Sequence, residues 1–163
     1  LKLWQELDPE LRKKSTLFFV GPETESGELA KLIRAIAQVD DHERIHIAGP
    51  SQRPHEWIRA ADLFLSCSEF EGMPLAPIEA LGSGVPGVLS FIPGHEFLEP
   101  FAELYPLQNP KKGAEAVERS ILRSLKDDAS YRQELWQKSK PIRDSFTLSA
   151  MSKHYDKLYE DSK

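Results

Sequence analysis

Short apolar runs that end at or near glycine alternate along this chain with patterns typical of amphipathic helices. Four runs have the length and composition of buried strands: 16–21, 44–49, 61–68 and 85–90. Apolar residues at helical spacing follow the first three runs: 26–39, 53–62 and 75–84. We expect Ser26 to be the N-cap of the first of these helices. Strands and helices joined by such short links predict right-handed βαβ units, and hence an α/β fold with a doubly wound parallel sheet flanked by helices.

The two ends of the chain depart from this alternation. The last third contains three amphipathic helical patterns and no further strand pattern: 110–128, 129–146 and 147–161. Residues 1–7 have the pattern of a helix end whose preceding strand is missing. We therefore expect residues 1–163 to form one domain, and this domain to be a fragment of a larger protein that lacks its first strand.

The bulk composition excludes several classes of function. The chain has a net charge of −5, which argues against a general nucleic-acid binder because phosphate binding requires a basic surface. No apolar run is long enough to span a bilayer. The single cysteine, Cys67, excludes an internal disulfide and a zinc site built from several cysteines. We expect the Cys67 thiol to be buried and inert.

Three loops are placed to bind a ligand, because open parallel sheets bind ligands at the carboxyl ends of their strands. They lie in the stretches 20–26, 48–54 and 68–86. In the third stretch, Pro74 and Pro77 exclude a continuous helix, because proline lacks an amide donor and clashes with the preceding turn. Proline is favourable in a first helical turn. The helix is therefore predicted to begin near Leu75.

Two glutamates bracket this predicted helix start. Glu71 lies in the loop, and Glu79 lies just after the first turn, where its side chain leans back toward the loop. Between them, the backbone amides of Gly72, Met73 and Leu75 are free to point at an anion at the helix N-terminus. This arrangement suits a phosphate between two polyhydroxyl groups. The spacing alone also fits an ordinary first-turn glutamate and a solvated loop residue, so both interpretations stay open at this point.

The stretch 71–86, EGMPLAPIEALGSGVP, resembles the E-x7-E signature of retaining glycosyltransferases with the GT-B fold, in particular glycosyltransferase family 4. The resemblance extends to the strand, turn and helix patterns around it: 17–32, 44–50, 57–72 and 146–159. It covers nearly the whole chain. It implies a Rossmann-like donor-binding domain, the C-terminal half of a GT-B fold, without the acceptor-binding N-terminal domain.

The resemblance also implies a role for individual residues of the E-x7-E stretch. Glu71 would be the catalytic-site carboxylate that contacts the donor-sugar hydroxyls, and Glu79 would hold the ribose hydroxyls. The other donor-binding residues that the resemblance implies would contact the donor largely through their backbone atoms: Gly72, Met73, Pro74, Leu75, Gly21, Gly49, Pro50 and Ser51. Of these, Gly21 would lie near the diphosphate, and the last three would border the nucleobase. Pro74 stands where glycine is commoner and removes one amide donor.

The same resemblance implies the partners and the limits of the chain. The donor would be a UDP- or GDP-linked sugar, bound without a metal or other cofactor. The family's diphosphate-binding arginine and lysine would lie upstream of Leu1, so we expect this chain alone to be inactive. The full-length protein is expected to be cytoplasmic and to act in cell-envelope polysaccharide assembly, with peripheral association at the inner face of the membrane left open.

Two alternatives share the fold. An epimerase-like domain of the GT-B type remains open, although it fits the signature less well. A non-catalytic nucleotide-binding module also remains open. Outside the signature, His95 follows the fourth predicted strand and is a further candidate for a donor contact, because it faces the same sheet edge.

Overall fold

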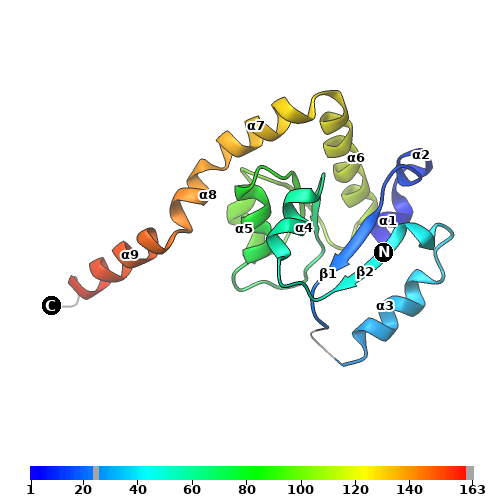
Figure 1. Ribbon diagram of the computed structural model, residues 1–163, viewed down its shortest axis with the longest axis horizontal. Helices are drawn as coiled ribbons and strands as arrows, with labels where there is room; N and C mark the ends of the chain where they lie inside the picture. The colour runs from blue at the N-terminus through cyan, green and yellow to red at the C-terminus, as the bar shows by residue number, and fades with distance from the viewer. Residues whose placement is uncertain (24–25, 161–163) are drawn as a thin grey trace.

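The structure, a computed structural model, describes residues 1–23 and 26–160 and contains two parallel sheets (Figure 1). One sheet pairs β1 (Leu17–Val20) with β2 (Ile45–Gly49). The other has the order β3 (Phe64–Ser66), β4 (Gly87–Ser90), β5 (Glu103–Tyr105). All pairs are parallel, which confirms the predicted α/β class. The described strands form two hydrogen-bonded sheets, because β1 and β3 do not pair with each other.

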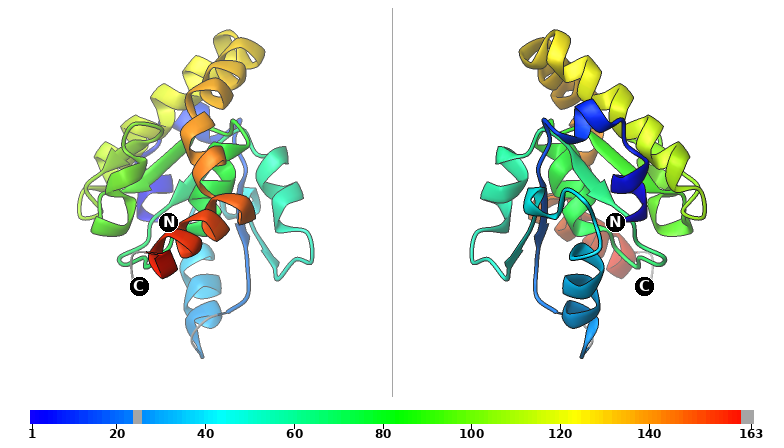
Figure 2. Two further views of the ribbon diagram at one scale, coloured as in Figure 1. Left: turned by 90° about the vertical axis from the view of Figure 1, so that its left-hand side faces the viewer. Right: turned by 90° about the vertical axis from the view of Figure 1, so that its right-hand side faces the viewer.

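Helices cover both faces of the strands. The α-helices in the described part of the chain are α1 (Lys2–Glu6), α2 (Pro9–Arg12), α3 (Glu28–Ile36), α4 (Pro54–Ala60), α5 (Leu75–Gly82), α6 (Pro110–Lys126), α7 (Asp128–Lys138), α8 (Lys140–Ser145) and α9 (Leu148–Glu160). Two 3-10 helices, η1 (His42–Arg44) and η2 (Pro93–Leu98), complete the order. Figure 1 shows α1 and α6 on one side of the strands and α4 and α5 on the other, and the side views of Figure 2 agree.

The two faces of β4 pack into two different hydrophobic clusters. Successive strand residues point to opposite faces, so Val88 joins the cluster with Leu3 and Val117 of α1 and α6. Leu89 joins the cluster with Ile78 of α5 and other residues near it. All four residues of β4 are buried, as is typical of a strand covered on both faces. Helices therefore cover both faces of the sheet at β4, as in a doubly wound fold.

Three sequence-based boundaries differ from the structure. The strand β5 was not predicted, because its three residues show no apolar run. The predicted helix 129–146 is two helices, α7 and α8, because Pro141 cannot continue a helix and lies instead in the first turn of α8. Ser26 is not the N-cap of α3. Gly27 takes that position with φ 89°, and the Glu23 carboxylate accepts hydrogen bonds from the amides of Gly27 and Leu29.

Candidate functional site

The start of α5 lies at Leu75, as the two prolines predict. Pro74 is its N-cap residue, and the Pro74 carbonyl accepts the first hydrogen bond, from the Ile78 amide, at 3.0 Å. The Leu75 amide donates to the Met73 carbonyl at 2.9 Å around Pro74 (φ −80°, ψ 70°), an inverse γ-turn. The expectation that the Leu75 amide is free to meet an anion is therefore wrong, because this turn uses it.

Other amides at the same helix end are available. Within the described residues, the amides of Gly72 and Met73 have no hydrogen-bond acceptor, and neither has the amide of Ala76, the second residue of α5. Sequence reasoning missed Ala76, although the rule that a first helical turn leaves its amides unpaired would have found it. Three donors beside a helix N-terminus form an arrangement suited to an anion such as a phosphate.

Glu71 lies in the loop before these amides and is held in one orientation. The Ser68 hydroxyl donates to Glu71 Oε1 at 2.7 Å, and Ser66 Oγ lies 3.2 Å from Ser68 Oγ. Glu71 is half-buried, and its carboxylate retains lone pairs for further donors. The loop therefore presents an oriented acceptor for hydroxyl groups.

Glu79 lies on α5, exposed to solvent, and its carboxylate makes no hydrogen bond or ion pair with the described residues. It borders a hollow of about 380 Å³ between α4, α5 and α8. The residues that line this hollow are His55, Arg59, Ile78, Glu79, Gly82, Ser83, Ile142, Arg143 and Phe146. Arg59 of α4 lines the same hollow as Glu79.

The predicted positions after β1 and β2 form a second group. The Gly21 amide donates to the Gly49 carbonyl at 2.9 Å, so the two turns lie together. Gly49 has φ 71°, a left-handed conformation that glycine adopts without strain. Pro50 follows, and Ser51 Oγ accepts a hydrogen bond from the Arg53 amide at 3.0 Å, immediately before α4. These residues lie at the end of the two-stranded sheet, whereas the Glu71 loop follows the three-stranded sheet.

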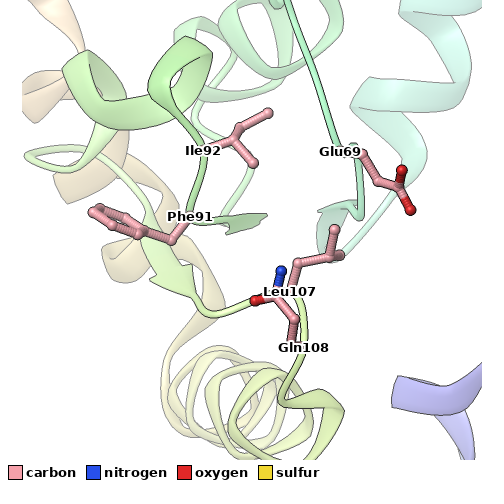
Figure 3. Close-up of a pocket in the computed structure, with 5 residues that line it drawn as sticks. All are labelled: Glu69, Phe91, Ile92, Leu107 and Gln108. Carbon is pink, nitrogen blue, oxygen red and sulfur yellow. The ribbon is translucent and has the colours of Figure 1, made fainter.

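A further hollow, of about 410 Å³, lies at the carboxyl ends of β3, β4 and β5 (Figure 3). It is lined by Glu69, Phe91, Ile92, Leu107 and Gln108. Figure 3 shows the Glu69 carboxylate and the Phe91 ring pointing away from each other. Because these groups do not converge on one point, we place no ligand in this hollow.

Two expectations about single residues are wrong. His95 is fully buried, so it cannot contact a donor directly. Cys67 is exposed rather than buried, and its sulfur accepts a hydrogen bond from the Tyr105 hydroxyl at 3.0 Å. Tyr105 itself, the last residue of β5, is buried.

The environment of Tyr105 predicts a loss of stability at alkaline pH. Burial, followed by the hydrogen bond to Cys67, raises the pKa of Tyr105 well above its ordinary value of about 10. The unfolded chain loses the phenolic proton first, so the free energy of unfolding should fall as the pH rises above about 10. In Tyr105→Phe this part of the fall should be absent, as measured by urea unfolding at pH 8 and at higher pH. An equally steep fall in both proteins would contradict this origin.

Two properties concern residues 1–23 and 26–160 as a whole. No helix there is long and apolar enough to cross a membrane. No three side chains among histidine, cysteine, aspartate and glutamate gather closely enough there to hold a metal ion.

The fold and the position of the site define an α/β domain that presents oriented loops at the carboxyl ends of parallel strands. Residues 2–127 match the family described as glycosyl transferases group 1. Because this match covers most of the chain, the protein belongs to that family. A comparison with curated proteins gives no match.

Three solved structures share the fold. Sucrose-phosphate synthase from Thermosynechococcus elongatus has a TM-score of 0.68 and 24% identity, over 90% of this chain and 38% of that protein. HepE from Anabaena in complex with UDP-glucose has a TM-score of 0.77 and 16% identity, over 98% and 43%. WaaG, a glycosyltransferase of lipopolysaccharide biosynthesis, has a TM-score of 0.69 and 17% identity, over 90% and 38%.

These similarities establish the fold of the GT-B glycosyltransferases and confirm that expectation. The chain spans about two fifths of the length of the three solved proteins. The site residues themselves are not tested by these similarities, so their roles stay predictions.

Proposed function

We propose that this chain is the donor-binding domain of a retaining glycosyltransferase of family 4, which transfers a sugar from a nucleoside diphosphate to an acceptor hydroxyl. The observation that carries the proposal is the cluster of unpartnered amides of Gly72, Met73 and Ala76 at the N-terminus of α5. The amides would hold the diphosphate, because backbone donors and the helix dipole favour negative charge.

The carboxylates on either side of these amides would hold the two ends of the donor. Glu71 would accept hydrogen bonds from the donor-sugar hydroxyls, and Glu79 would accept them from the ribose hydroxyls. The absence of a protein partner for Glu79 in the described residues leaves its oxygens available for this purpose. The turn of Gly49, Pro50 and Ser51 would border the nucleobase, and Gly21 would lie near the diphosphate.

Similar proteins support a uracil nucleotide as the donor. HepE has been solved with UDP and with UDP-glucose, and the pneumococcal O-GlcNAc transferase GtfA has been solved with UDP and GlcNAc. A GDP-linked sugar remains the second candidate. We further propose that donor binding and transfer with retention need no metal, because the helix N-terminus and its amides would neutralise the diphosphate.

The sheet edges support a larger donor domain in the full-length protein. Leu17 and Phe19 of β1 and Leu65 of β3 pack against one hydrophobic cluster, although their sheets share no hydrogen bonds. We propose that a strand from elsewhere in the full-length protein joins the two sheets, and that transfer also requires an acceptor-binding domain. Hydrogen exchange of the β1 and β3 amides should be slower in the full-length protein than in this chain; equal exchange would argue against the additional strand.

The proposal is tested by thermal unfolding of this chain with UDP, GDP, UDP-glucose, GDP-mannose and UMP. A ligand that binds only the folded state stabilises it by about 2.7 kcal/mol at a concentration of a hundred times its Kd. UDP or GDP should raise the melting temperature, and UMP should raise it less than UDP because it lacks the second phosphate. No shift with any diphosphate would contradict the proposal, and equal shifts with UDP and UMP would contradict the role of the amides.

A further inference from the structure

The loop that carries Glu71 lies beside the loop that follows β4. The strands β3 and β4 are paired in parallel, with Ser66 opposite Leu89, so both chains leave the sheet at the same edge. Ser90, the last residue of β4, is fully buried, and its hydroxyl donates to the Ser68 carbonyl at 2.6 Å. This bond joins the end of β4 to the loop that follows β3, two residues beyond Ser66.

His95 fixes the second loop. It is fully buried, and its Nδ1 lies 2.8 Å from the Ser90 carbonyl oxygen. A carbonyl can only accept a hydrogen bond, so Nδ1 carries the proton and donates it to Ser90. The other ring nitrogen, Nε2, has no hydrogen-bond partner in the described residues.

Gly94 presses directly on Glu71. A Cβ at position 94 would lie 2.4 Å from the Glu71 carbonyl oxygen and 2.9 Å from the Glu71 Cβ. Both distances are far below van der Waals contact, so no side chain fits there without moving Glu71. We define Ser90, Gly94 and His95 as the brace. It contacts the backbone of the Glu71 loop at Ser68 and at Glu71, and the Ser68 hydroxyl then orients the Glu71 carboxylate.

We propose that the brace and Ser68 are positioning residues that hold the Glu71 carboxylate against the sugar of the donor. This inference rests on the proposed function and adds a second loop to the site. The brace contacts the loop ahead of the α5 amides, and Glu79 lies beyond them on the helix. A loss of the brace or of Ser68 should therefore weaken contacts to the sugar and leave contacts to the nucleoside diphosphate unchanged.

The test compares the affinities for UDP and UDP-glucose, and for GDP and GDP-mannose, by calorimetric titration of this chain. In Ser68→Ala, the affinity for the nucleotide sugar should fall about twofold to tenfold, the value of one lost hydrogen bond. The affinity for the matching nucleoside diphosphate should stay constant. Ser68→Thr, which keeps the hydroxyl, should restore the sugar affinity, and Ser130→Ala on the exposed face of α7 serves as control.

Gly94→Ala provides a second variant that acts on the brace itself. Its folding is first checked by circular dichroism and thermal unfolding. A folded Gly94→Ala protein should show the same selective loss for the nucleotide sugar, because Glu71 must shift away from the added methyl group. If it does not fold, Ser90→Ala, which removes the hydroxyl that donates to the Ser68 carbonyl, takes its place and should show the same selective loss.

The outcomes separate this inference from the proposed function. If the unaltered chain binds neither nucleotide nor nucleotide sugar, the proposed function is wrong and the inference falls with it. If the chain binds both, and Ser68→Ala weakens both equally or neither, the proposed function stands and the positioning role is wrong.

Discussion

Replacing Glu79 by alanine is expected to weaken UDP binding by about tenfold to a hundredfold, because hydrogen bonds to a charged group each contribute about 1.5–3 kcal/mol. The Glu79 side chain is exposed and makes no hydrogen bond or ion pair with the described residues, so the fold should not change. Calorimetric titration with UDP measures the effect, and urea unfolding verifies that stability is retained.

Glu115→Ala is the matched control for this variant. Glu115 is also an exposed helical glutamate, on α6, and its carboxylate likewise makes no hydrogen bond or ion pair with the described residues. Its replacement should leave UDP affinity unchanged. Equal UDP affinity in Glu79→Ala and in the unaltered chain would show that the ribose assignment is wrong.

Replacing Leu89 by alanine is expected to lower the free energy of unfolding by about 2–5 kcal/mol. Leu89 is fully buried in β4, the central strand of the three-stranded sheet, and packs with Ile78, Leu81 and Leu98. Removing three carbons there creates a cavity between the sheet and α5, which the strand cannot close. Because domains are stable by about 5–15 kcal/mol, this one change removes a large fraction of the total.

Leu125→Ala is the control for this second variant, since Leu125 is 72% exposed on α6. Its replacement should change stability by less than about 0.5 kcal/mol. Urea unfolding at pH 7 measures both proteins. A loss below about 1 kcal/mol in Leu89→Ala would contradict the central position of β4 in the core.

Features that local chemistry determines were predictable from the sequence. Pro74 and Pro77 placed the start of α5 correctly, because proline restricts its own backbone and that of the preceding residue. The end of α5 follows from a glycine: Gly84 has φ 76°, and the Gly84 and Val85 amides donate to the Leu81 and Ala80 carbonyls in a Schellman motif.

Features that depend on distant contacts were not predictable. The N-cap residue of α3 is Gly27, and the carboxylate that accepts from the first amides belongs to Glu23, four residues earlier, which a search for an N-cap side chain does not detect. The strand β5 exists because it pairs with β4 and not because of its own short sequence. Its pairing partner is known only once the chain has folded.

The candidate site shows the same division. The positions of Glu71 and Glu79 on either side of the helix start follow from the spacing of residues in one segment. The burial of His95, its bond to Ser90 and the contact of Gly94 with Glu71 join two loops that follow different strands. The sequence placed His95 at the correct sheet edge. The predicted donor contact was wrong because His95 is buried, and burial depends on the packing of the folded chain.

The central claim, that a nucleoside diphosphate binds at the carboxyl edge of the sheets, is tested most directly by NMR. The ¹⁵N-labelled chain is titrated with UDP, and the backbone amide shifts are followed residue by residue. The largest changes should occur at Gly72, Met73 and Ala76, with further changes at Gly49 and Ser51. Changes confined to other segments, such as α7 or α9, or no changes at millimolar UDP, would contradict the claim.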